Sequence, residues 1–198
     1  EISSLKDRES NHRLYELVKL IRYNLELTES LAVTLAEELD FVKTYIGLEE
    51  QVLQPGFEFH IDIDPALDIH RVKIPVMLLQ IPVENAVKHA LSCKDGIRML
   101  WIEVKKDKGG GFKVKSNSYG TGTGMKVLSQ TIQLLNSYNR YPLIMQINNV
   151  EIKERGELGC EVKFTIPLDY SYLLGRAKDT NLWKRCIEQL SLMMKRVQ

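Results

Sequence analysis

Apolar residues in the first fifty positions recur at steps of three and four, which is the spacing of one face of a helix. One such stripe runs from Leu14 to Leu25. The sequence Thr34-Leu35-Ala36-Glu37 predicts the start of a second helix, because it forms a capping box whose hydroxyl and carboxylate satisfy exposed backbone N–H groups. The apolar seam of this helix consists of Leu35, Leu39, Val42 and Ile46. Two interpretations stay open, an ordinary core or a stalk that pairs with another subunit.

From Gln54-Pro55-Gly56 onward the pattern changes to strict alternation, which predicts a strand and a domain boundary just before it. The apolar residues of this strand are Phe57, Phe59, Ile61 and Ile63. The pattern further predicts an apolar helix beginning near Pro75, a strand over 99–104, a helix over 124–139, and strands over 143–147 and 162–166. Because these elements do not alternate regularly, we expect an α+β fold, a two-layer α/β sandwich whose helices cover one face of a mostly antiparallel sheet.

Past Pro167 the apolar residues return to helical spacing, which predicts a C-terminal amphipathic helix after a cap at Asp179 or Thr180. Its stripe consists of Trp183, Ile187, Leu190, Met194 and Val197. We expect this helix to pack onto its own subunit, with a contact surface for a partner as the alternative. The chain is thus predicted to divide into a helical segment (1–53), an α/β domain (54–170) and a helical tail (171–198).

Charge and cysteine content exclude several classes of protein. The 198 residues include 27 basic and 26 acidic ones, so no net field favours nucleic acid or an anionic membrane as the main partner. The three cysteines, Cys93, Cys160 and Cys186, have no C-x-x-C spacing, which argues against a zinc site or a disulfide framework and suits a reducing cytoplasm. No run approaches the roughly 18 apolar residues of a membrane span.

Polar side chains interrupt an otherwise apolar helix within the sequence Gln80-Ile81-Pro82-Val83-Glu84-Asn85-Ala86-Val87-Lys88-His89. Asn85, Lys88 and His89 lie three and four residues apart, so a regular helix places them on one face. An amide oxygen is a good ligand for Mg²⁺, and a lysine and an imidazole can contact phosphate oxygens. Taken alone, such a cluster is more often a solvated helix face than a site.

Two glycine-rich segments follow. The segment Gly120-Thr121-Gly122-Thr123-Gly124 opens a helix, where free backbone N–H groups attract anions and glycines permit a close approach to phosphate. The earlier segment Asp107-Lys108-Gly109-Gly110-Gly111 offers a carboxylate that is able to accept a hydrogen bond from the amine of adenine. A plain hairpin turn between two strands would use the same residues, and this alternative stays open.

Taken in order, these three segments resemble the asparagine box and the two glycine boxes of the ATPase superfamily that includes gyrase, histidine kinases and MutL. The amino-acid sequences of these segments most resemble those of the LytS-like sensor histidine kinases. The resemblance rests on Thr34 to Leu39 with Tyr45, on Ile74-Pro75 through Glu84 to His89, and on Gly120 to Val127. It covers roughly residues 11–167.

This resemblance implies a Bergerat-type ATP-binding fold with ATP and Mg²⁺ as cofactors. Asn85 would coordinate Mg²⁺ on the nucleotide phosphates, with Glu84, Lys88 and His89 beside them. Asp107, with Gly109 and Gly111, would read adenine, and the lid over the triphosphate would consist of Gly120, Thr121, Gly122, Thr123 and Gly124.

The resemblance also implies the reaction and the partners. Such a kinase gives the γ-phosphoryl group of ATP to a histidine on a dimerisation helix, and a response regulator receiver domain then accepts it. The implied state is a homodimer, with 1–53 as the remnant of its dimerisation stalk, on the cytoplasmic side of an inner-membrane receptor.

Several residues depart from the family pattern. The four histidines, His12, His60, His70 and His89, lack the neighbours of the family's phosphoacceptor, so we expect that acceptor upstream of Glu1 and no catalytic residue within this chain. The family has two strands between the asparagine box and the adenine aspartate, whereas one predicted strand precedes Asp107. Gly159 is followed by Cys160, where the family tends to have threonine.

Two other functions compete with a kinase. A degenerate, non-catalytic module would keep the fold for signal transmission or partner binding. A hydrolytic ATPase would need a carboxylate one helical turn before Asn85, and that position holds Ile81.

Overall fold

The computed structural model describes residues 31–53, 57–91, 98–107, 112–117, 123–152 and 157–173. The helices predicted before residue 31 and after residue 179 lie outside these ranges. The described elements are β1 (Ala32–Thr34), α2 (Leu35–Leu53), β2 (Phe57–Ile63), β3 (Lys73–Pro75), α3 (Gln80–Asn85), the π-helical turn η1 (Ala86–Leu91), β4 (Arg98–Lys106), β5 (Phe112–Asn117), α4 (Thr123–Asn136), β6 (Ile144–Ile152) and β7 (Glu157–Ile166).

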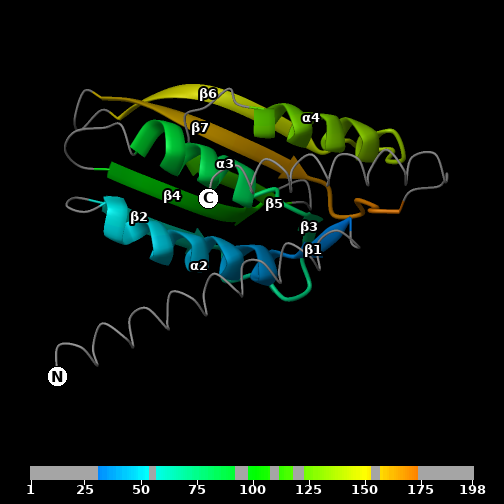
Figure 1. Ribbon diagram of the computed structural model, residues 1–198. Coiled ribbons are helices and arrows are strands. Elements are labelled where there is room, and N and C mark those ends of the chain that lie inside the picture. The colour runs from blue at the N-terminus through cyan, green and yellow to red at the C-terminus, as the bar shows by residue number, and fades with distance from the viewer. Residues whose placement is uncertain are drawn as a thin grey trace.

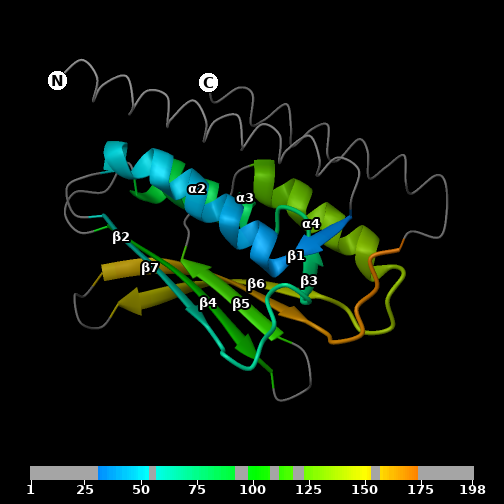
Figure 2. The same ribbon diagram turned by 90° about the horizontal axis from the view of Figure 1, so that it is seen from below.

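A five-stranded sheet in the order β2-β4-β5-β7-β6 forms one layer of the molecule (Figure 1). β2 pairs with β4 in parallel, and every other neighbouring pair in this sheet is antiparallel. Figure 2 shows α2, α3 and α4 together over one face of the sheet, with the short β1–β3 pair at one end of α2. The predicted α+β order of helices and a mostly antiparallel sheet is confirmed for the described residues.

Helix α2 begins with the predicted capping box. The Glu37 N–H donates to Thr34 Oγ1 at 3.2 Å, and the Thr34 N–H donates to Glu37 Oε2 at 2.7 Å. The predicted seam of the helix is buried together with residues of α3, α4 and the sheet in one hydrophobic core. This burial agrees with the ordinary-core interpretation for the described part of the helix, and the division of the chain at residue 54 stays a prediction.

The strands bury alternate residues against the helical layer. On β2, Phe57 to Ile63 alternate between half-buried and exposed, as the sequence predicts. On β4, Leu100, Ile102 and Val104 are fully buried, while Trp101 is exposed and stacks on His60 of β2. This alternation leaves one face of the sheet for the core and the other for solvent.

The helix predicted from Pro75 begins five residues later, at Gln80. Pro82 then falls in the first turn, where its missing N–H costs no intrahelical hydrogen bond. In a helix beginning at Pro75 the same proline would occupy the interior and disrupt it. Met77, in the intervening turn, has a φ of 64°, which is rare for a residue with a side chain and interrupts the helix.

Two asparagines fix the end of α4. Asn136 Oδ1 accepts hydrogen bonds from the Leu143 N–H at 2.8 Å and the Tyr170 hydroxyl at 2.7 Å, and its Nδ2 donates to the Leu143 carbonyl at 2.9 Å. Asn139 makes a similar exchange with the backbone of Ser171. The helix that follows the second glycine segment is thus tied to the strand after it and to the chain after β7.

Candidate functional site

Asn85 is the last residue of α3, and its side chain is only 9% exposed. Within the described part of the chain, Nδ2 of its amide has no hydrogen-bond partner. A buried amide without a partner costs free energy, so the group is expected to meet a polar atom that the described residues do not supply. Its oxygen is also suited to Mg²⁺. The asparagine singled out by the sequence therefore has the surroundings of a ligand-binding group.

A row of hydrogen bonds runs along the helix beside Asn85. Gln80 Nε2 donates to Glu84 Oε1 at 2.7 Å, and the Lys88 ammonium lies 3.2 Å from Glu84 Oε2 as an ion pair. Both partners of that pair are mostly buried, with exposed side-chain fractions of 25% and 15%. The predicted grouping of Glu84 with Lys88 is thus present as a direct contact.

The expected regular helical face is not present. The chain changes from α-helix to a π-helical turn at Ala86, directly after Asn85. Because a π-turn has more residues than an α-turn, the angular spacing of Asn85, Lys88 and His89 differs from that of a regular helix. Such turns occur frequently at functional sites. The side chain of His89 lies outside what the structure describes.

Glu38 of α2 is a polar residue that the sequence reasoning missed. Its carboxylate is fully buried and accepts backbone hydrogen bonds from Met77 at 2.5 Å, Leu79 at 3.1 Å and Gln80 at 3.3 Å. Burial raises the pKa of Glu38 to about 7, with a smaller rise from the charge of Glu84, although the three N–H groups act in the opposite direction. A signal was present, since Glu38 lies between Leu35 and Val42 on the apolar face of its helix.

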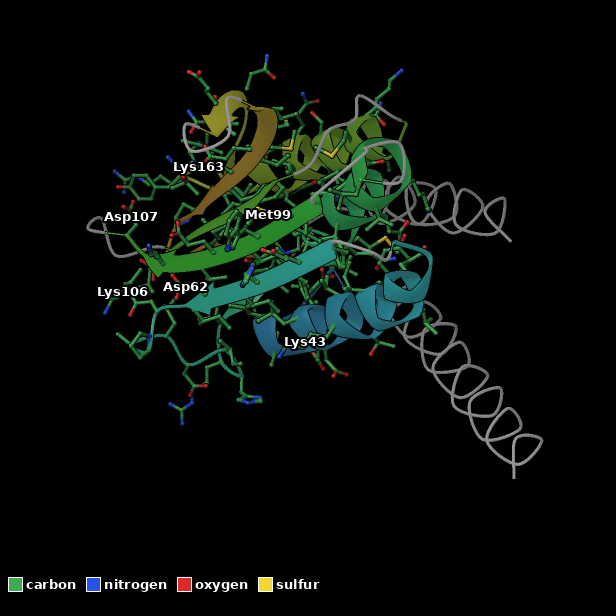
Figure 3. The ribbon with its side chains drawn as sticks, turned by 90° about the vertical axis from the view of Figure 1, so that its left-hand side faces the viewer. Lys43, Asp62, Met99, Lys106, Asp107 and Lys163 are labelled. Carbon is green, nitrogen blue, oxygen red and sulfur yellow. The ribbon has the colours of Figure 1, made fainter. Side chains whose placement is uncertain are left out.

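Asp107 follows directly after β4, at the opposite end of the strand from Arg98. β4 is nine residues long, so Asp107 is roughly 30 Å along the strand from Arg98. Figure 3 shows Lys106 and Asp107 at the end of β4, beside the end of β2 that carries Asp62. β4 and β5 are antiparallel, and Lys106 lies opposite Phe112, so the two strands form a hairpin. This agrees with the alternative in which Asp107 to Gly111 belong to a hairpin turn.

The second strand of the family pattern is β5, which comes after Asp107 instead of before it. This strand order differs from the family pattern that the adenine assignment of Asp107 follows. The second strand after the asparagine helix ends at Ser116 and Asn117. No aspartate or glutamate is available there, because residues 108–150 contain neither. Asp107 therefore precedes the second strand, and its assignment to adenine stays a prediction of the resemblance.

A cavity of about 430 Å³ adjoins the same end of β4. Its walls come from the β2–β3 connection, from Lys106, and from the chain after β7, including Tyr170 and Tyr172. Asn85 and Lys88 are not among its lining residues. The cavity is thus separate from the polar row on α3.

The remaining predicted residues are only partly described. Gly109, Gly111, Gly120, Thr121 and Gly122 lie outside the described ranges, and Thr123 and Gly124 are described only as the backbone that begins α4. Cys160 is buried in β7 and forms no disulfide. Among the residues that the structure covers, no group of histidine, cysteine and acidic side chains could hold a metal by itself. None of the helices in this part of the chain has the length and apolarity to cross a membrane.

The histidine kinase family model matches residues 1–55 of the chain. That match ends within the connection between α2 and β2, so it includes the whole of α2 and Glu38.

Curated relatives match a longer stretch. Sensor protein LytS of Bacillus subtilis is 25% identical over 173 residues, which cover 78% of this chain and 28% of that protein. Sensor histidine kinase YpdA of Escherichia coli is 28% identical, with the same two coverages of 78% and 28%. Sensor histidine kinase/phosphatase LytS of Staphylococcus aureus is 33% identical and covers 66% of this chain and 22% of that protein. The chain thus spans about a quarter of the length of these relatives.

Among solved structures, a histidine kinase domain from the blue-light activated histidine kinase of Erythrobacter litoralis is similar to this chain with a TM-score of 0.49 and 15% identity. The overlap covers 89% of this chain and 78% of that domain.

Proposed function

Because this chain belongs to the LytS-like sensor histidine kinases, we propose that its described part is the ATP-binding catalytic portion of such a kinase. In this proposal the helical layer over the five-stranded sheet is a Bergerat-type sandwich. It binds Mg·ATP beside α3 and gives the γ-phosphoryl group to a histidine outside residues 1–198. A response regulator receiver domain then accepts the phosphoryl group.

The burial of Asn85 is the observation that carries the proposal. Its amide offers an oxygen to a hard cation and an N–H donor without a protein partner among the described residues. Those are the two contacts that a magnesium ion and a phosphate oxygen require from one side chain. The bound Mg²⁺ would supply charge neutralisation on the phosphates.

The other residues have supporting roles in this proposal. The Glu84–Lys88 pair holds an ammonium group near the site, where it can attract phosphate oxygens. His89 comes next in the same turn. The N–H groups at the start of α4, after Gly120, Thr121 and Gly122, supply an anion-binding end for the phosphates. For the protein, the chemistry is positioning and charge stabilisation.

Recognition of adenine is weaker in this proposal than the family pattern implies. Asp107 belongs to the hairpin, and no acidic residue follows it before Glu151. We therefore leave Asp107 out of the proposed site. Without a carboxylate that accepts a hydrogen bond from the exocyclic amine of adenine, the site should distinguish ATP from GTP poorly. Only a buried acceptor strongly rejects a base that lacks this amine.

The missing carboxylate favours a second candidate function, a degenerate kinase-like module that transmits signals or binds partners without turning over ATP. Hydrolysis by a water-activating base is not favoured, since Ile81 is buried and apolar at the required position. In either case we propose a homodimer on the cytoplasmic side of an inner-membrane receptor.

Calorimetric titration of the purified chain with a non-hydrolysable ATP analogue, with and without Mg²⁺, tests the proposal without requiring the acceptor histidine. Saturable binding that depends on Mg²⁺ supports the kinase. The same titration with the GTP analogue tests the base recognition. If a demonstrably folded chain binds neither nucleotide, the degenerate module is favoured instead.

A further inference from the structure

The buried carboxylate of Glu38 joins two helices that are far apart in the sequence. Its Oε1 accepts the N–H of Met77, and its Oε2 accepts the N–H groups of Leu79 and Gln80, which lie 39 to 42 residues further along the chain. The N–H groups of Leu79 and Gln80 are donors at the start of α3 that lack an intrahelical acceptor, and Met77 lies in the turn just before it. Leu79, the residue at the cap position, supplies no side-chain hydrogen bond. The start of α3 is thus held by a residue of α2.

The backbone at this contact is strained, so the contact also fixes the conformation of Met77 in addition to capping α3. Met77 has a φ of 64° and is 1% exposed, so a buried side chain sits on an unfavourable backbone. Such a conformation persists only where its surroundings fix it. The hydrogen bond from the Met77 N–H to Glu38 is one interaction that does so.

From this contact a continuous row of hydrogen bonds reaches the neighbours of Asn85. The Gln80 backbone donates to Glu38, and the Gln80 side chain donates to Glu84. Glu84 in turn pairs with Lys88. Glu84 directly precedes Asn85 in the chain. A shift of α2 that displaces the Glu38 carboxylate would therefore move the helix that carries the proposed nucleotide contacts.

We propose that Glu38 is a positioning residue that couples α2 to the nucleotide-binding face of α3. The proposal rests on the proposed function, because it assigns the output of the coupling to the Asn85 site. Since α2 lies within residues 1–55, the coupling connects the segment that matches the histidine kinase family to the nucleotide. Coupling between two sites is reciprocal, so nucleotide binding must also change the stability of α2.

The first arm of the test needs no nucleotide. Amide hydrogen exchange is measured in the full chain and in Glu38→Gln, which keeps the size of the side chain but places an NH₂ group against backbone donors. We expect exchange at Met77, Leu79 and Gln80 to be about tenfold faster in this variant. Glu37→Gln is the matched control, because Gln serves equally well in the capping box. Unchanged exchange in Glu38→Gln overturns the proposal.

The second arm adds the Mg²⁺ complex of a non-hydrolysable ATP analogue. In the full chain and in Glu37→Gln, binding should slow exchange throughout residues 35–53. In Glu38→Gln we expect affinity to fall about tenfold and this protection of α2 to be lost even at saturation. Glu38→Asp, which keeps the charge, should recover part of the protection. Equal affinity with full protection in Glu38→Gln would overturn the coupling. A full chain that does not bind nucleotide at all would overturn the proposed function, while the first arm still decides whether Glu38 fixes the start of α3.

Discussion

Asn85 combines burial with an amide donor that has no partner within the described residues. Leaving such a group unsatisfied costs about 1–3 kcal/mol, and a ligand that supplies an acceptor recovers this free energy on binding. A residue of this kind slightly lowers the stability of the free protein and increases the affinity for the ligand.

We expect Asn85→Ala to abolish magnesium-dependent binding of the ATP analogue while the free energy of unfolding stays the same or rises slightly. The reason is that the substitution removes both the Mg²⁺ ligand and the buried unsatisfied donor. Calorimetric titration and urea denaturation measure the two effects. Asn148→Ala, on the exposed face of β6, serves as the control and should leave binding unchanged. Unchanged affinity in Asn85→Ala would contradict the assignment of this residue.

The buried Glu38 should make stability depend on pH. Burial raises its pKa from 4.5 to about 7 in the folded chain, so the folded state binds this proton more tightly than the unfolded state does. The resulting stabilisation is complete below pH 4.5 and is lost as the pH rises through about 7. The shift corresponds to about 3 kcal/mol. Urea denaturation at several pH values should show this decrease in the full chain and a flatter profile in Glu38→Gln. Parallel profiles would show that another group is responsible.

The sequence identified Asn85, Glu84 and Lys88 because polar residues stand out within an apolar helix. It did not identify Glu38, since two adjacent glutamates in a first helical turn are common and one of them, Glu37, has an obvious capping role. The position of Glu38 on the apolar face was a signal that it faces inward, but the backbone donors that it meets depend on where α3 lies, which is a property of the tertiary structure.

At the scale of elements, α4 is fixed more firmly at its end than its sequence suggests. Asn136 exchanges hydrogen bonds with Leu143 and accepts one from the Tyr170 hydroxyl. These bonds determine where the helix that follows the glycine segment points. Sequence periodicity predicted the helix itself, but not these contacts, because they join residues that the helical pattern does not relate.

We expect Asn136→Ala to lower the free energy of unfolding by about 3 kcal/mol, because it removes three partly buried hydrogen bonds of about 1 kcal/mol each. Asn136→Asp keeps the acceptor for Leu143 and Tyr170 and should cost less. Thermal or urea denaturation gives both values. Equal losses in the two variants would indicate that the Oδ1 acceptor contributes little.

At the scale of the whole molecule, the described residues share one core, to which α2 contributes. The residues of α2 that are buried in it are Leu35, Leu39, Phe41, Val42, Tyr45 and Ile46. The turn signal at Gln54-Pro55-Gly56 predicted a domain boundary, and the helix that precedes it shares buried core residues with the elements that follow it. The fold class was predictable, since periodicity survives in each element. The parallel pairing of β2 with β4 was not predictable, because the pattern within each strand does not determine which strands become neighbours.

We expect a chain that begins at residue 54 to lose cooperative folding. Six buried side chains contribute on the order of 10 kcal/mol, which is comparable to the entire free energy of unfolding of a typical domain. Circular dichroism during urea denaturation should show a cooperative transition for residues 1–198 and none for residues 54–198. A cooperative transition in the shorter chain would support the predicted boundary at residue 54 and contradict this expectation.

The parallel pairing of β2 with β4 affects the order in which the parts of the molecule fold. β2 lies at an edge of the sheet, and β4 is its partner there. This pair can form only after the intervening residues 64–97, which include α3 and Asn85, have closed into a crossover. Contacts that enclose a long stretch of chain form slowly, because the entropy of closure is lost before any bond is gained. The antiparallel hairpins β4–β5 and β6–β7 should therefore assemble early, and a newly made chain should become able to hold a nucleotide only in the last kinetic phase.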